Sequence, residues 1–178
     1  MRPLPSTSPI RGAGARRMLG MALAAAALGL TVAAPPAPRL VWNMSASAPT
    51  GLYWVRPRAR LARGMTVIAR LPEPYRQLAA TRRYLPGNVP LVKRVVALEG
   101  DRVCAQGGTI LLNGMPVAAR RRADRAGRAM PWWQGCMRLG ADEVFLLMTD
   151  APGSFDGRYF GRSRKAEVIG AARLLWAR

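Results

Sequence analysis

Histidine is absent from this sequence of 178 residues. The imidazole ring is the base of Ser-His-Asp triads and of Cys-His pairs, and it is a ligand in many zinc sites. All three kinds of site are therefore excluded. A nucleophilic serine in this chain needs a lysine, a carboxylate or the N-terminal amine as its base.

Cysteine is scarce, with only Cys104 and Cys136 in the chain. Two cysteines are too few for a Cys-only zinc site, and they do not form a Cys-x-x-Cys motif. A disulfide between them is one interpretation if the domain lies in an oxidising compartment, and it would contribute about 3–4 kcal/mol. Two buried free thiols are the other interpretation, and non-reducing mass spectrometry distinguishes the bridged state from the state with free thiols.

Lysine and acidic residues are few beside arginine. Of the 28 basic residues only Lys93 and Lys165 are lysines, and nine acidic residues leave a formal net charge of +19. An excess of Ala and Arg is typical of genomic bias, so most of this charge indicates a solvated cationic surface. Its field still favours anionic lipid headgroups or nucleic acid. A DNA-contacting protein is therefore an alternative, but no aromatic platform is interleaved with the arginines, and we expect no specific nucleic-acid partner.

One apolar run near the N-terminus has almost the length of a membrane span. Residues 1–17 are rich in Pro, Ser, Gly and Arg and predict a disordered basic leader. Residues 18–34 carry no charge and span about 26 Å as a helix, against about 30 Å of hydrocarbon. Arg16 and Arg17 can extend the span by snorkelling, and they favour a cytoplasmic N-terminus. We therefore expect a transmembrane anchor over residues 18–34.

A cleavable signal segment is the alternative for the same run, because its end is rich in small residues. Pro35 disfavours a cut after Ala34, whereas a cut after Ala33 stays open. Both interpretations place the remaining chain outside the cytoplasm. That part consists of a semi-rigid Pro-rich linker over residues 35–42 and a domain over residues 43–178.

Short apolar runs separated by Gly, Pro, Asn or Asp dominate the chain from Leu40 onward. This pattern is typical of strands and turns, and the pair Asn113-Gly114 is a strong signal for a β-hairpin. One helix is expected from Pro74 to Leu85, and a polar, cationic loop over residues 119–130. The sequence therefore predicts a single, mostly β domain, with strands within residues 51–57, 64–71, 91–98, 101–106, 108–117, 143–150 and 166–176.

Lys93 lies in one of these expected strands. Strand alternation places Lys93 on the face of Leu91, Val95 and Ala97, which is otherwise apolar, and points Arg94 to the opposite face. Burial disfavours the ammonium form and lowers the pKa from about 10.4. A pKa of 7–8, suited to a general base, requires roughly 3–4 kcal/mol of differential destabilisation. The alternative is a lysine that snorkels at a sheet edge.

A set of motifs in a fixed order links the chain to a known family. The segments are SAPTGLY, then VKRVVALEGD about forty residues later, then GDRV, LNGMPV and SFDGRYFG. Together they resemble bacterial type I signal (leader) peptidases, and within these the TraF-type peptidases of conjugative transfer systems. The resemblance covers roughly residues 43–176. It implies a compact signal-peptidase-like β domain behind one N-terminal transmembrane helix.

The resemblance implies a catalytic pair formed by Ser47 and Lys93. Ser47 matches the nucleophile and Lys93 its general base, and the two-residue step from Ser47 to Pro49 is the TraF-type spacing. Ser45 matches the position whose hydroxyl completes the oxyanion hole together with the N–H of the nucleophile. Each such donor stabilises the oxyanion of the transition state by on the order of 3 kcal/mol.

Further supporting residues are implied by the last motif. Ser154 matches the serine that hydrogen-bonds the lysine, and Asp156 with Arg158 matches an ion pair near the site. Whether Asp156 is catalytic or structural stays open. The family pattern GDNRDNS is here MTDAPGS, so Asp150 corresponds only loosely. The large second β domain of some leader peptidases is also missing.

The activity implied is that of a membrane-anchored serine endopeptidase in the bacterial inner membrane, with its domain on the periplasmic side. Expected partners are membrane lipid, a peptide substrate such as a pilin precursor, and conjugation or secretion machinery; no cofactor or metal is expected. The acyl group passes to water, or to the substrate's own N-terminus with cyclisation. Alternatives are a general signal peptidase for secreted proteins and a non-catalytic membrane component of a conjugation or type IV secretion system.

Overall fold

The chain forms a helical unit and a β unit. The computed structural model describes the backbone of residues 11–178, and the division between the units falls between Ala37 and Pro38. The helical unit holds α1 (Arg11–Ala33), whose candidate membrane span Gly14–Ala33 is 20 residues long and includes Arg16 and Arg17 near its start. That length, about 30 Å, is sufficient to cross a membrane, although a signal sequence has the same properties.

The structure corrects two of the expected boundaries. The leader predicted to be disordered up to residue 17 is helical from Arg11, because Ala and Arg favour helix and no proline interrupts the chain between Pro9 and Pro35. The rest of that prediction, residues 1–10, lies outside the described residues. The Pro-rich linker ends at Arg39 rather than at residue 42, because β1 (Leu40–Asn43) pairs with the following strand.

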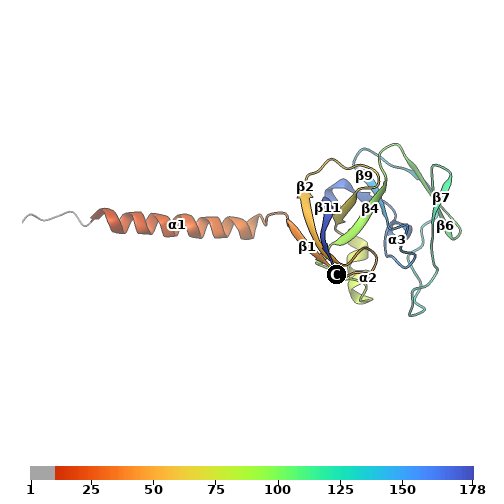
Figure 1. The fold of residues 1–178 in the computed structure, drawn as a ribbon, viewed down its shortest axis with the longest axis horizontal. Coiled ribbons are helices and arrows are strands. Elements are labelled where there is room, and N and C mark those ends of the chain that lie inside the picture. Colours follow the sequence, from red (N-terminus) through yellow and green to blue (C-terminus); the bar gives the residue numbers. More distant parts are fainter. Residues whose placement is uncertain (1–10) are drawn as a thin grey trace, which may run out of the picture. The chain divides into compact units, whose positions relative to one another are not determined.

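The β unit contains two antiparallel sheets (Figure 1). The seven-stranded sheet has the order β1-β2-β11-β3-β4-β9-β10, and the four-stranded sheet has the order β7-β6-β5-β8. The strands that follow β1 are β2 (Gly51–Pro57), β3 (Thr66–Ala69), β4 (Leu91–Ala97), β5 (Arg102–Gln106), β6 (Thr109–Leu112), β7 (Met115–Ala119), β8 (Gly135–Arg138), β9 (Glu143–Leu147), β10 (Ser163–Arg164) and β11 (Val168–Ala177). The prediction of a mostly β domain is confirmed.

Two of the predicted elements differ in detail from the structure. The hairpin is confirmed, since Asn113 and Gly114 join β6 to β7 and both have positive φ, as a tight hairpin turn requires. The predicted helix is shorter: α2 spans Glu73–Thr81, because the chain then turns so that Tyr84 and Leu85 pack against the core. The strand predicted from residue 166 begins at Val168, after the short 3₁₀ helix η1 (Lys165–Glu167).

A shared apolar core joins the two sheets. Phe145 and Leu147 of β9 pack against Val103 and Ile110 of the four-stranded sheet, and all four side chains are buried. The two cysteines lie opposite each other on β5 and β8 and form a disulfide. The bridge thus links two paired strands of the smaller sheet. Within the described residues, neither cysteine contacts Ser47 or Lys93 by a hydrogen bond.

Candidate active site

A tight turn over residues 43–49, here called the serine turn, carries Ser45 and Ser47 between β1 and β2. Asn43 is buried, and its side-chain Nδ2 lies 3.0–3.2 Å from the backbone oxygens of Ser45, Ala48 and Pro49. Its Oδ1 accepts a hydrogen bond from the N–H of Ser45 at 3.0 Å. One amide therefore satisfies four backbone groups and fixes the loop, as short polar side chains do in turns.

The end of the serine turn is fixed by a side-chain hydrogen bond and by a close approach of two backbone segments. The Tyr53 hydroxyl donates to the Pro49 oxygen at 2.8 Å. Gly51 has φ of 144°, and a Cβ at this position would lie 2.0 Å from the oxygen of Trp176. Any larger residue would push β2 away from β11, so glycine is required at this position for the turn to join the sheet.

Lys93 enters the site from the middle of the larger sheet. It lies on β4, which has β3 on one side and β9 on the other, and it is 2% exposed. Arg94 is partly exposed and pairs with Asp150 at 3.2 Å. The prediction that strand alternation buries the lysine and turns the neighbouring arginine outward is confirmed.

The lysine amine meets two hydroxyl groups. Its Nζ donates to Ser47 Oγ at 3.0 Å and to Ser154 Oγ at 3.0 Å. Burial lowers the pKa of Lys93 from 10.5 to about 8, while Asp156 raises it and Arg158 lowers it by smaller amounts. An amine with such a pKa is neutral in a useful fraction of molecules near neutral pH, so it can accept a proton from a hydroxyl within hydrogen-bond distance.

Ser45 lies beside the same hydroxyl. The two serine Oγ atoms are 3.0 Å apart, and the N–H of Ser47 donates to Ser45 Oγ at 3.4 Å. An O–H and an N–H are thus close together at the serine turn. In this structure the two groups are hydrogen-bonded to each other, with the N–H of Ser47 directed at Ser45 Oγ.

Asp156 and Arg158 form a fully buried ion pair next to the Lys93 site. Their side chains are 0% and 1% exposed, and the carboxylate accepts from Arg158 Nε at 2.8 Å and from Nη2 at 3.1 Å. Asp156 also accepts from the N–H of Met148, and Arg158 donates to the oxygens of Met148, Pro152 and Ala119. The pair therefore fixes the segment that carries Ser154 to the ends of β7 and β9. Neither residue is a hydrogen-bond partner of the Lys93 amine among the described contacts.

A cleft of about 650 Å³ opens onto these groups. Ser45, Ser47, Lys93 and Ser154 line it together, with apolar side chains such as Leu91 nearby. Asp150, which corresponds only loosely to the family pattern, also lines the cleft, but its exposed carboxylate is paired with Arg94.

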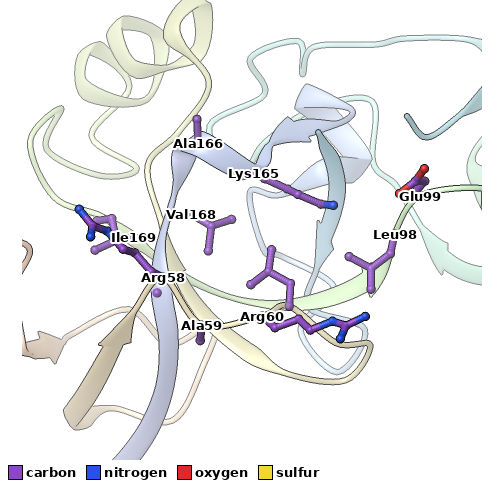
Figure 2. A pocket seen from close by; sticks show the side chains of 11 residues that line it. Arg58, Ala59, Arg60, Leu98, Glu99, Lys165, Ala166, Val168 and Ile169 are labelled. Atoms are coloured by element: carbon purple, nitrogen blue, oxygen red, sulfur yellow. The ribbon is translucent and has the colours of Figure 1, made fainter. Parts of the chain in front are cut away.

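A second cavity, of about 580 Å³, lies at the opposite end of β2 from the serine turn. Figure 2 shows Arg58, Arg60 and Lys165 around it, together with apolar side chains that include Val168. None of the residues lining this cavity carries a hydroxyl or thiol group. It therefore provides no serine-type or cysteine-type nucleophile, and the first cleft is the candidate active site.

Sequence reasoning missed Asn43, which organises the serine turn. The signal was present, because Asn side chains commonly hydrogen-bond the backbone two residues further on and form an Asx-turn. It also missed the segment after α2 and the arginine-rich loop as walls of the cleft, since these meet the serines only through the tertiary fold.

Comparisons with known proteins agree with the ordered motifs. Residues 14–177 match the family described as Signal peptidase, peptidase S26. Two plasmid transfer proteins TraF from Escherichia coli are 35% and 34% identical to this chain, over 75% and 71% of it and over 82% and 76% of their own lengths. A signal peptidase I from Leptolyngbya laminosa is 29% identical over 48% of this chain and 40% of its own length. The resemblance found in the sequence is confirmed, and the chain belongs to the signal peptidase family, peptidase S26.

Proposed function

We propose that this protein is a serine endopeptidase with a Ser47–Lys93 catalytic dyad, and that it cleaves exported precursor proteins. The observation that carries the proposal is the 3.0 Å contact between Lys93 Nζ and Ser47 Oγ in a chain without histidine. Burial keeps the pKa of this amine near 8, which suits a general base.

In the first step Ser47 Oγ attacks the carbonyl carbon of the bond to be cut, and Lys93 accepts the hydroxyl proton. The oxyanion that forms receives hydrogen bonds from the N–H of Ser47 and the hydroxyl of Ser45. Ser154 keeps the amine in place, because it accepts a hydrogen bond from Lys93 at 3.0 Å. Asp156 and Arg158 act as positioning residues, since they fix the segment on which Ser154 lies.

In the second step the protonated Lys93 gives its proton to the leaving amine, and the C–N bond breaks. An acyl ester on Ser47 remains. Water attacks this ester with Lys93 again acting as the base, or an amine of the substrate attacks and forms a new peptide bond. In both routes the bond from Ser47 Oγ to the acyl carbon breaks, and Lys93 returns the proton to Oγ. The first route leaves a carboxylate end and the second a joined chain.

The substrate and location follow from features outside the dyad. The apolar helix α1 suits a membrane anchor, and Trp42, Trp54 and Trp176 are all at least 40% exposed on the β unit. Indole side chains favour membrane interfaces. Because two relatives are plasmid transfer proteins, we propose that the substrate is a component of a plasmid-transfer apparatus, such as a pilin precursor, at the periplasmic face of the inner membrane.

The test of the dyad uses the two lysines of the chain. Lys93→Arg is expected to abolish processing of a co-expressed pilin precursor, because arginine does not release its proton near neutral pH. Lys165→Arg is the matched control and should leave processing unchanged. Ser47→Ala should be as inactive as Lys93→Arg. Normal processing by Ser47→Ala would favour a non-catalytic channel component instead.

The mass of the product separates the two fates of the acyl ester. A cyclised product is lighter by one water than the hydrolysed product of the same cut. Processing of unrelated secreted precursors at similar rates would favour a general signal peptidase over a dedicated transfer enzyme.

A further inference from the structure

One wall of the active-site cleft is cationic. Arg83 follows α2, and Arg121 and Arg125 lie on the loop over residues 120–130, here called the arginine loop; all three are exposed and line the cleft. Within the described chain none of the three forms a salt bridge with a carboxylate. Their positive charge is therefore available to something that enters the cleft.

The acidic groups of the cleft do not cancel this charge, because each already has its own partner. Asp124 pairs with Arg128 at 2.7 Å, and Asp150 pairs with Arg94 at 3.2 Å. Three arginines thus remain without compensation in the cleft that holds Ser47 and Lys93.

The arginine loop is held in a defined conformation. Asp124 accepts from the Tyr84 hydroxyl at 2.5 Å and from the N–H groups of Ala126 and Arg128 at 2.9 Å each. Arg82 donates to the oxygen of Ala129 at 2.7 Å, which joins the loop to the end of α2. Arg83 and the arginine loop are therefore presented together, as parts of one wall.

Arg83 occupies a backbone conformation that favours glycine. Its φ is 57°, in the left-handed region, just after the C-cap residue Arg82. Helices usually place glycine at this position, because a Cβ is strained there. The chain contains 18 glycines but has an arginine here. Because Arg58 has a similar φ of 55° outside the cleft, what distinguishes Arg83 is its place in the cleft wall.

We propose that Arg83, Arg121 and Arg125 select substrates that carry carboxylates within a few residues of the cut bond. The recognised segment is an acidic peptide, and its carboxylates are aspartate or glutamate side chains or a nearby C-terminus. This inference rests on the proposed peptidase function and adds a selection rule to it. The selection acts through substrate binding and leaves the chemistry of Ser47 and Lys93 unchanged.

The test uses the detergent-solubilised full chain and peptides that span the cleavage site mapped in the co-expressed precursor. Three matched peptides carry Gln, Glu or Lys at the polar positions flanking the cut, placed before or after it in separate series. We expect kcat/KM to rank Glu above Gln above Lys, with Glu about five- to tenfold above Gln for three weak exposed pairs. Versions with a free or amidated C-terminus separate a terminal carboxylate from side-chain carboxylates.

Two arginine variants provide a matched pair. Arg83→Gly relieves the strained backbone and removes one of the three charges from the cleft, so it should fold and lose about twofold of the Glu preference. Arg58→Gly makes the same change at a residue that also has positive φ, 55°, but lines the second cavity (Figure 2). It should keep the full preference.

The outcomes distinguish a failure of the proposed peptidase function from a failure of the selection rule alone. If neither the peptides nor the precursor is cut, the proposed function fails. If all three peptides are cut equally well, the selection rule is overturned while the peptidase stands. An equal loss in Arg83→Gly and Arg58→Gly would also overturn it, because the effect would then come from the net charge of the chain. Higher salt should shrink the Glu preference.

Discussion

Replacing Lys93 with methionine should abolish activity but increase the free energy of unfolding at neutral pH. In the folded chain the lysine has a pKa of about 8, against 10.5 for an unperturbed lysine. At 1.36 kcal/mol per pKa unit, this lowering corresponds to about 3 kcal/mol of destabilisation of the charged form. The buried ammonium therefore opposes folding at neutral pH, and Lys93→Met removes this cost together with the base.

The sign of the pH dependence follows from proton binding. Between pH 8 and 10.5 the unfolded chain keeps the Lys93 proton while the folded chain has lost it, so the stability of the wild type rises with pH in this window. Lys93→Met has no such group. The free energy of unfolding of the wild type, relative to the variant, should therefore increase by about 3 kcal/mol between pH 7 and pH 10.5.

The assay is urea denaturation of both proteins over this pH range, together with the pH profile of kcat/KM for the wild type. Below pH 8 the rate should rise about tenfold per pH unit, because only the neutral amine acts as the base, and it should level off above pH 8. A stability difference that stays constant with pH, or a rate that still rises tenfold per unit above pH 10, would refute the argument.

Three further predictions concern the groups around the dyad. Ser45→Ala should lower kcat on the order of 100-fold with KM little changed, because one oxyanion donor is lost; an unchanged kcat would remove Ser45 from the oxyanion hole. Asp156→Asn should cost about 3–5 kcal/mol in denaturant titrations, since it leaves the Arg158 charge buried without a partner. Cys104→Ala should cost about 3–4 kcal/mol and leave the kcat of the folded enzyme unchanged, because the disulfide links strands outside the cleft; a kcat loss without a stability loss would contradict this.

Most strands, and the sheet face on which their side chains lie, could be predicted from local patterns in the sequence. The Asn113-Gly114 turn and the inward position of Lys93 depend on residues close together in the chain, and both were predicted. The short strands β8 and β10 were not, because they lack an apolar run and exist only through pairing with β5 and β9. Such strands are stabilised by their neighbours rather than by their own residues.

The residues that we propose as catalytic were predicted from family motifs, whereas the walls of the cleft are formed by the fold alone. Ser47 and Lys93 are 46 residues apart, and no periodicity brings them together. The same holds for Arg83 and Arg125, which line the same cleft as the serines and lie on two distant loops that are joined by the hydrogen bond from Tyr84 to Asp124. Contacts between loops depend on tertiary packing, so sequence patterns do not reveal them.

The buried ion pair explains how an acidic residue can lie near the Lys93 amine while the pKa of this amine stays low. Asp156 alone would raise the pKa of Lys93, whereas Arg158 lowers it. Because the two charges are held together by two hydrogen bonds, their effects on the amine oppose each other. Burial then remains the dominant influence on the pKa. The pair can fix the Ser154 segment by strong charged hydrogen bonds while the amine keeps the low pKa that a general base requires.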